Sequence, residues 1–154
     1  MTPSHPSWQA RSHGASPVSS GTTVSGSFDL VTGAAAGASA GDFDIDGGTT
    51  SVRSPAITLP STGTLTLNFS QYLAHGSNAS SADFLRVSIV HSGGTTAVFT
   101  RTGAAADLDA VWAAASASLN PYAGQSIRIL IEAADASGAS LVEAGVDNVT
   151  ITQS

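Results

Sequence analysis

The chain has 154 residues, of which only 10% are charged, and its formal net charge is −6. Ala (26), Ser (24), Gly (16) and Thr (16) together make 82 residues, so the expected surface carries hydroxyls and small groups rather than charges. A chain of this length fits one domain, and an acidic chain with five Arg and no Lys repels phosphate backbones and anionic lipids, which argues against nucleic-acid and membrane partners. Cysteine is absent, which excludes a disulfide framework and a Cys-type zinc site.

Two regions differ in their pattern. Residues 1–21 hold three Pro and six Ser but few large apolar side chains, and they predict an irregular N-terminal arm. From residue 22 to residue 154, short apolar runs alternate with turn residues. This spacing is typical of an all-β sandwich domain.

Period-2 alternation is clearest in the run of Leu65, Leu67 and Phe69, whose side chains are expected to point into a core. The same pattern recurs in residues 85–89 and 127–131, where β-branched residues and Leu alternate with Arg, Ser or other outward positions. Turn residues lie between such runs at 92–94, 120–124 and 135–140.

One segment, residues 103–119, is rich in Ala and favours a helix by propensity. Beyond Trp112, however, only Ala and Ser continue up to Leu119, so no apolar stripe could anchor such a helix. We therefore expect a loop with a short turn of helix, followed by a strand from about Trp112.

Alternating carboxylates at Asp42, Asp44 and Asp46 form the densest acidic feature. In an extended chain they point the same way at intervals of about 7 Å, and a hard cation such as Ca²⁺ would relieve their repulsion. The stretch matches the first half of an EF-hand loop, but Arg53 stands where the bidentate Glu belongs. Further ligands would have to come from elsewhere in the chain, and the available acids are Glu143 and Asp147. A solvated acidic turn is the alternative interpretation.

Catalytic signals are weak. Residues 37–41 spell G-x-S-x-G around Ser39, but a nucleophile elbow needs a strand before it and a helix after it, whereas this stretch is flanked by Ala-Gly repeats and the acidic stretch. His75 could act as a base with Asp83 nearby, but no third group completes the arrangement, and a histidine bonded to backbone explains His75 equally. The sequence therefore does not predict an enzyme.

A saccharide platform requires aromatic rings, of which the chain has two Trp, two Tyr and five Phe. Tyr72, Trp112 and Tyr122 could stack on sugars, with core or rim packing as the alternative. The candidate ligand-binding residues are Tyr72, His75 and Tyr122.

Six segments together carry a resemblance to a known family, the D-x-D-G-G-T motif and the E-A-x-V-D-N-V motif being the most specific. The segments are residues 21–27, 30–33, 44–57, 72–77, 83–87 and 140–149. In order and spacing they resemble the C-terminal accessory β-sandwich of secreted bacterial metallopeptidases and zinc carboxypeptidases. That family is similar in shape to jelly-roll carbohydrate-binding modules and to MAM-type adhesion domains.

The resemblance implies an antiparallel jelly-roll β-sandwich, secretion and a structural Ca²⁺. It also implies that residues 8–11 match an early strand that contains a Trp, while the strand before it is missing. A missing strand leaves an open sheet edge that could pair with another chain in a homo-oligomer. The implied calcium ligands are Asp44, Asp46, Glu143 and Asp147, with Asp42 outside the shared core.

The resulting hypothesis is a non-catalytic, calcium-stabilised accessory module of a secreted bacterial hydrolase. Its partner would be a polysaccharide or a protein surface. Two alternatives stay open: a lectin-like carbohydrate-binding module, and a structural subunit that assembles with itself through the open sheet edge.

Overall fold

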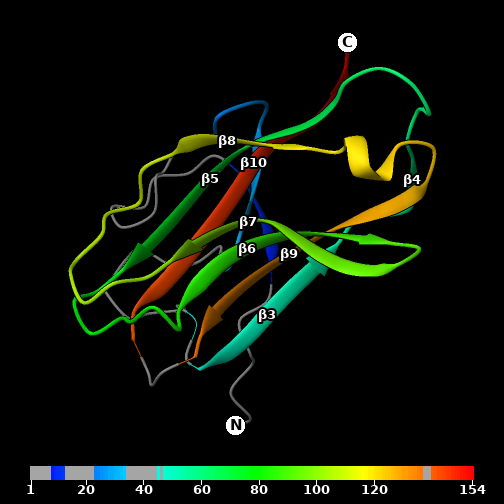
Figure 1. Cartoon of the computed structure of the whole chain (residues 1–154). Coiled ribbons are helices and arrows are strands. Elements are labelled where there is room, and N and C mark those ends of the chain that lie inside the picture. Colours follow the sequence, from blue (N-terminus) through cyan, green and yellow to red (C-terminus); the bar gives the residue numbers. More distant parts are fainter. Residues whose placement is uncertain (1–7, 13–22, 34–44, 46, 137–139) are drawn as a thin grey trace, which may run out of the picture.

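A computed structural model describes residues 8–12, 23–33, 45, 47–136 and 140–154, and it shows two antiparallel sheets packed face to face (Figure 1). Ten strands and one 3₁₀ helix occur in the described residues. The elements are β1 (Gln9–Ser12), β2 (Phe28–Val31), β3 (Gly48–Arg53), β4 (Ile57–Thr58), β5 (Leu65–His75), β6 (Phe84–His91), β7 (Gly94–Thr102), β8 (Ala113–Ser118), η1 (Asn120–Tyr122), β9 (Ser126–Asp135) and β10 (Val142–Gln153).

The order of the strands within the two sheets defines the topology of the fold. Sheet A has the order β1-β2-β10-β5-β8, and sheet B has the order β3-β9-β6-β7 with β4 also paired to β9. Strands β2-β10-β5-β8 facing β3-β9-β6-β7 give the arrangement of a jelly roll, in which the chain repeatedly crosses between two sheets. The predicted all-β antiparallel sandwich is confirmed.

The core lies between the sheets and follows the predicted alternation. Leu65, Leu67 and Phe69 of β5 are at most 3% exposed and face the inner residues of β6 and β9. Because every second residue of these strands is apolar, each sheet presents one continuous apolar face. The inner residues of sheet B are Leu85, Val87, Ile89, Ile127, Ile129 and Ile131.

The Ala-rich segment contains the predicted strand, which is β8. The short helical turn expected before it is wrong, because residues 103–112 contain no helix. The helical turn lies instead at η1, where Pro121 occupies the start of the helix. Proline favours that position because its fixed φ suits the first turn and its missing N–H has no partner to lose there.

The prediction from composition that residues 1–21 are irregular is wrong for Gln9–Ser12, whereas the strand that the family resemblance implies at residues 8–11 agrees with the structure. Gln9–Ser12 form β1, which pairs antiparallel with β2 and makes one edge of sheet A. Backbone pairing decides the conformation here, and the composition of so short a strand does not reveal it. The missing strand expected before Trp8 falls outside the described residues.

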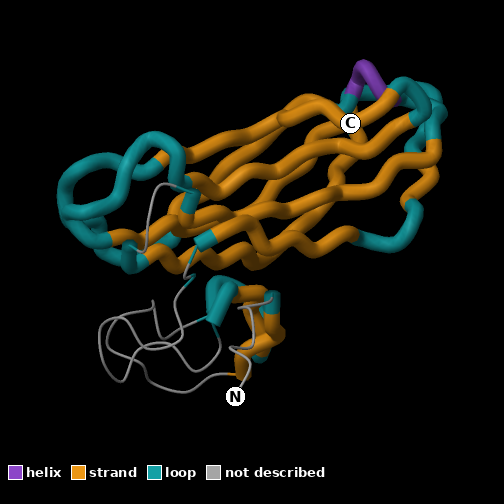
Figure 2. The backbone as a smooth tube through the Cα atoms, turned by 90° about the horizontal axis from the view of Figure 1, so that it is seen from below, coloured by secondary structure: helices purple, strands orange, loops and turns teal. Residues whose placement is uncertain are grey.

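The two ends of the sandwich carry different elements (Figure 2). At the end that we call the helix end lie η1, the β6–β7 turn and the C-terminus, where the Thr64 and Ser154 backbones exchange hydrogen bonds of 2.8 and 3.1 Å. At the opposite end, the acid end, β9 finishes at Asp135 and β6 begins just after Asp83. No helix in the described part of the chain is long and apolar enough to cross a membrane.

Candidate functional site

Two described residues adjoin the predicted acidic stretch, and both contact the acid end. Asp42, Asp44 and Asp46 lie outside the described residues, but Ile45 and Gly47 are described. The Ile45 N–H donates to the Val142 carbonyl at 3.1 Å, and the Gly47 N–H donates to Asp135 Oδ2 at 3.1 Å. These residues adjoining the acidic stretch therefore contact the end of β9 and the start of β10.

Asp135 is a buried carboxylate that sequence analysis missed. It is 0% exposed, and besides Gly47 it accepts hydrogen bonds from the backbone N–H and the hydroxyl of Ser140 at 3.1 and 2.8 Å. An ionised carboxylate can be buried only when donors replace its lost water, and here three donors do so. Its position at the end of an apolar strand, followed by a Ser- and Gly-containing turn, was the available signal.

Glu143 and Asp147 both lie on the outer face of β10, because Val142, Ala144 and Val146 between and beside them face the core. Both acids are buried, at 4% and 8% exposure. Four residues of extended strand separate their Cα atoms by about 13 Å, which exceeds what one Ca²⁺ with ligands at about 2.3–2.6 Å can bridge from both side chains. A single ion could therefore take one of them.

The Asp147 carboxylate already has three backbone donors. Oδ2 accepts from the N–H groups of Val24 and Ser25 at 2.6 and 3.0 Å, and Oδ1 accepts from the N–H of Asn148 at 2.6 Å. Asp147 thereby fastens the loop before β2 to β10. In the described ranges, no group of three or more His, Asp or Glu side chains is placed to hold a metal.

Tyr72 lies on the outer face of sheet A and is 1% exposed. Its ring contacts Trp112 edge-on, with centroids 4.8 Å apart and planes at 80°, and it covers Gly145 of β10. This burial agrees with the packing interpretation of Tyr72 and leaves almost none of its ring surface for a ligand.

His75 ends β5 and is 5% exposed. Its Nδ1 lies 3.2 Å from the Gly76 carbonyl, and its backbone exchanges hydrogen bonds of 3.0 and 2.9 Å with Leu108. The Asp83 carboxylate accepts from the backbone N–H groups of Ser80 and Ala136, so it fixes the acid-end turns instead of orienting the imidazole. The Ser39 motif lies outside the described residues.

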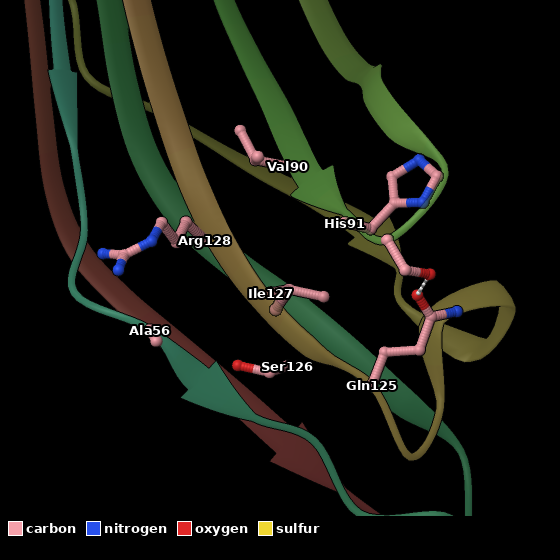
Figure 3. A pocket seen from close by; sticks show the side chains of 8 residues that line it. Ala56, Val90, His91, Gln125, Ser126, Ile127 and Arg128 are labelled. Atoms are coloured by element: carbon pink, nitrogen blue, oxygen red, sulfur yellow. Dashed lines mark hydrogen bonds between the residues drawn. The ribbon is translucent and has the colours of Figure 1, made fainter.

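A groove of about 460 Å³ opens at the helix end, and this volume is typical of small-molecule sites (Figure 3). We call it the helix-end groove. The side chains of Val90 and Ile127 lie between its two polar sides in Figure 3. The residues that line it are Ala56, Val90, His91, Ser92, Gln125, Ser126, Ile127 and Arg128.

Arg128 and Ala56 lie on one side of the helix-end groove. The Arg128 guanidinium donates to the Ser54 carbonyl at 3.0 Å, and the Ser54 hydroxyl accepts the Ile129 N–H at 2.9 Å. These bonds tie the segment between β3 and β4 onto β9. Only one of the five guanidinium N–H donors has a partner among the described residues, so the others can serve a ligand.

His91, Ser92 and Gln125 lie on the other side. The Ser92 hydroxyl donates to Gln125 Oε1 at 2.9 Å, which joins the β6–β7 turn to the turn before β9. Because the Gly93 N–H donates to His91 Nδ1, the ring carries its proton on Nε2, 3.0 Å from the Thr96 hydroxyl. Both ring nitrogens are thereby engaged, and the imidazole is held in one orientation.

Tyr122, a predicted ligand-binding residue, packs against His91 on this side of the helix-end groove. It is 7% exposed, and its ring centroid lies 4.9 Å from that of His91 at a tilt of 45°. Of the three predicted ligand-binding residues, Tyr122 is thus the one whose ring contacts a lining residue of the groove. His91, Gln125, Ser126 and Arg128 were not identified as site residues from the sequence, because only the fold brings these separate segments together.

A second hollow, of about 320 Å³, lies on the outer face of sheet A. The residues that line it are Asn68, Phe69 and Ser70 of β5, Ala114, Ala115 and Ser116 of β8, and Asn148. Asn148 has a φ of 52°, a conformation that Asn tolerates better than most residues, and it begins the irregularity in the pairing of β10 with β5. No charged side chain lines this second hollow.

Solved structures with a similar fold are binding domains. The cleaved K1 adhesin domain of Lys-gingipain from Porphyromonas gingivalis W83 matches with a TM-score of 0.61 and 14% identity, covering 99% of this chain and 86% of that one. A family 61 carbohydrate-binding module in complex with β-1,4-galactotriose matches at 0.50 and 14%, covering 85% and 74%. A family 16 carbohydrate-binding module matches at 0.50 and 12%, covering 97% and 86%. At these identities the likeness shows the fold.

No protein-family model matches the chain, and no curated protein matches its sequence. The resemblance of the six sequence segments to accessory domains of metallopeptidases therefore stands on those segments, whereas the carbohydrate-binding and adhesin β-sandwich fold stands on the structure.

Proposed function

We propose that this chain is a non-catalytic carbohydrate-binding module that serves as an accessory domain of a secreted bacterial hydrolase. The observation that carries the proposal is the helix-end groove, found in a fold shared with two carbohydrate-binding modules and an adhesin domain. The accessory role and secretion rest on the resemblance of the sequence segments.

The chemistry of the helix-end groove suits a saccharide. A sugar ring has apolar C–H faces and hydroxyl edges, so it needs an apolar surface beside hydrogen-bonding groups. The partly exposed Val90 and the exposed Ala56 supply the apolar surface, while Gln125, Ser126 and Arg128 supply amide, hydroxyl and guanidinium groups. All of these side chains project from strands or from turns tied to strands, so the ligand would meet a largely preformed surface.

Affinity electrophoresis in gels containing single polysaccharides tests the proposal. The panel comprises neutral galactan and glucomannan, and anionic pectate, alginate and hyaluronan. We expect at least one polysaccharide to retard the wild-type protein, and Gln125→Ala to reduce that retardation. The matched control is Ser116→Ala in the second hollow, which should leave it unchanged. Migration unaffected by every polysaccharide would contradict carbohydrate binding.

We further propose that Ca²⁺ stabilises the acid end. Asp44 and Asp46 would hold the ion, with Glu143 as the nearer of the two acids of β10, because Ile45 is bonded to Val142 next to Glu143. Asp42 would be an additional ligand, and Asp147 would keep its role of fastening the loop before β2. The ion would neutralise carboxylates that otherwise repel one another.

Calorimetry with and without chelator tests the ion. A ligand that binds only the folded state raises apparent stability, so EDTA should lower the melting temperature by several degrees and added Ca²⁺ should restore it. Asp44→Asn combined with Asp46→Asn should abolish this response. An identical melting temperature in EDTA and in Ca²⁺ would remove calcium from the proposal.

The sheet-edge hypothesis has one supporting feature, the edge strand β8. It consists only of Ala and Ser, pairs with β5 on one side and has no charged residue, although charges commonly protect exposed edges. Light scattering at high protein concentration should reveal a dimer or larger assembly under this hypothesis, and a monodisperse monomer would exclude it.

A further inference from the structure

We infer that the saccharide bound in the helix-end groove is anionic, and that Arg128 receives its carboxylate. This inference rests on the proposed carbohydrate-binding function and narrows it to one class of ligand, polysaccharides that contain uronic acids. The argument starts from the distribution of charge.

Arg128 is the only charged residue among those that line the helix-end groove. The chain as a whole is acidic, with a net charge of −6, so a groove that contains a cation and no carboxylate departs from the average surface. Asp83 and Asp135 lie at the opposite end of the sandwich, and Glu143 and Asp147 lie on sheet A. No carboxylate among the groove-lining residues therefore offsets the positive charge of Arg128.

Two further arginines lie on the outer face of sheet B, but neither lines the helix-end groove. Arg53 and Arg86 alternate with core residues of β3 and β6, so they share the outer face with Arg128. Glu132 is the one acid on this face in the described strands, and it stands directly opposite Arg86 in the register, at a distance from the groove. Arg86 therefore has an acid opposite it, whereas no acid lines the groove beside Arg128.

The geometry of Arg128 favours a carboxylate. A guanidinium presents its donors in a planar fork that matches a carboxylate in two parallel hydrogen bonds. The bond to the Ser54 carbonyl fixes one N–H and so orients the remaining fork without satisfying it. Across the groove, the Gln125 amide donates to the Pro121 carbonyl at 3.4 Å and accepts from Ser92, which holds it in place to meet sugar hydroxyls.

The experiment compares ligands that differ either in charge or in the presence of sugar rings. Isothermal titration of the whole chain uses trigalacturonate, its methyl ester, and poly-glutamate, which carries carboxylates without sugar rings. Oligomers of alginate and hyaluronan extend the test to other uronates. We expect at least one uronate oligomer to bind, and its methyl ester and poly-glutamate to bind at least tenfold more weakly.

Two variants with the same loss of charge identify the residue. Arg128→Gln should weaken uronate binding at least tenfold, whereas Arg86→Gln, near the other end of sheet B, should change it less than twofold. Equal losses in both variants, or equal binding of poly-glutamate, would show a diffuse charge effect and overturn the inference.

The outcome also separates this inference from the proposed function. If neutral galactan or glucomannan binds and no uronate does, the anionic ligand is wrong while carbohydrate binding stands. If no saccharide binds, both proposals fail. Binding of uronates that depends on Arg128 and not on Arg86 supports both.

Discussion

The acid end and the helix end of the sandwich both concentrate polar side chains, but they use them differently. At the acid end, Asp83 and Asp135 are at most 1% exposed and accept hydrogen bonds from backbone groups of the surrounding turns. At the helix end, Arg128 and Gln125 are only partly buried and line a groove. Polar groups that are buried and hydrogen-bonded inside the protein stabilise the fold, and partly exposed groups with spare donors at a surface are available to ligands.

Removal of Asp135 should have the largest effect on the free energy of unfolding. It tests the structural role of the buried carboxylates at the acid end. Asp135→Ala leaves the N–H groups of Gly47 and Ser140 without their acceptor, and buried unpaired donors are costly. We expect a loss of about 3 kcal/mol in the free energy of unfolding, measured by urea denaturation. The matched control is Asp107→Ala, an exposed acid, which should change stability by less than about 0.5 kcal/mol. Equal effects of the two substitutions would contradict a structural role for the buried carboxylate.

Between the two ends, the contact of Tyr72 with Gly145 should show the next largest effect. A Cβ at position 145 would collide with the ring of Tyr72, which is held by Trp112. Gly145→Ala should therefore cost about 2 kcal/mol by overpacking.

A double-mutant cycle checks the cause of that loss. In a Tyr72→Leu background the ring is gone, so Gly145→Ala should cost less than about 0.5 kcal/mol there. If the alanine is equally costly in both backgrounds, the clash with Tyr72 is not the reason.

A smaller effect is expected for Asn120, which is the structural polar residue of the helix end. Its Oδ1 accepts the Leu65 N–H at 2.7 Å and so joins η1 to the start of β5. Asn120→Ala should lower the free energy of unfolding by about 1 kcal/mol, measured by thermal and urea unfolding. Asn120→Asp keeps an oxygen acceptor and should recover most of the loss. Equal free energies of unfolding for the two variants would show that this hydrogen bond does not stabilise the helix end.

The smallest effect on stability is expected for Arg128, although it has the largest expected effect on binding. Arg128→Gln removes one hydrogen bond to Ser54 at a partly exposed site, so the free energy of unfolding should change by less than about 0.5 kcal/mol in urea. A loss above about 1 kcal/mol would assign Arg128 to the same structural role as Asp135 and erase the contrast between the two ends.

The strands could be predicted because each buries one face. Leu65, Leu67 and Phe69 fall on the core side of β5, and a period of two is visible in any strand with one apolar face. Strand β8 was predictable for the opposite reason, since its Ala and Ser residues lack the apolar stripe that a packed helix needs. Strand β1 could not be predicted from periodicity, because four residues with no apolar alternation become a strand only through pairing with β2, and only the family resemblance indicated a strand at residues 8–11.

The candidate site was harder to predict from the sequence than the strands were. Ala56, Val90 and Arg128 belong to segments far apart in the chain, and only the register of β6 and β4 on β9 brings them to one groove. The acidic stretch was visible because its residues are adjacent, whereas Asp135 acquires its partners from a turn and from Gly47, 88 positions away. Local sequence patterns predict strands and acidic stretches. A binding surface built from the ends of several strands can be located only when the strand topology is known.

Strand β1 has a practical consequence for anyone who trims or tags the protein. It supplies the outermost strand of sheet A, yet it pairs with β2 alone. Proteolytic removal of residues 1–12 would uncover the backbone of β2 beside Phe28, which is already 63% exposed. It would also remove Trp8, which packs against the core and donates from its indole N–H to the Thr50 carbonyl of β3 at 3.4 Å. A shortened preparation would unfold at lower denaturant concentration and precipitate on storage, so fusion partners belong on the C-terminal side.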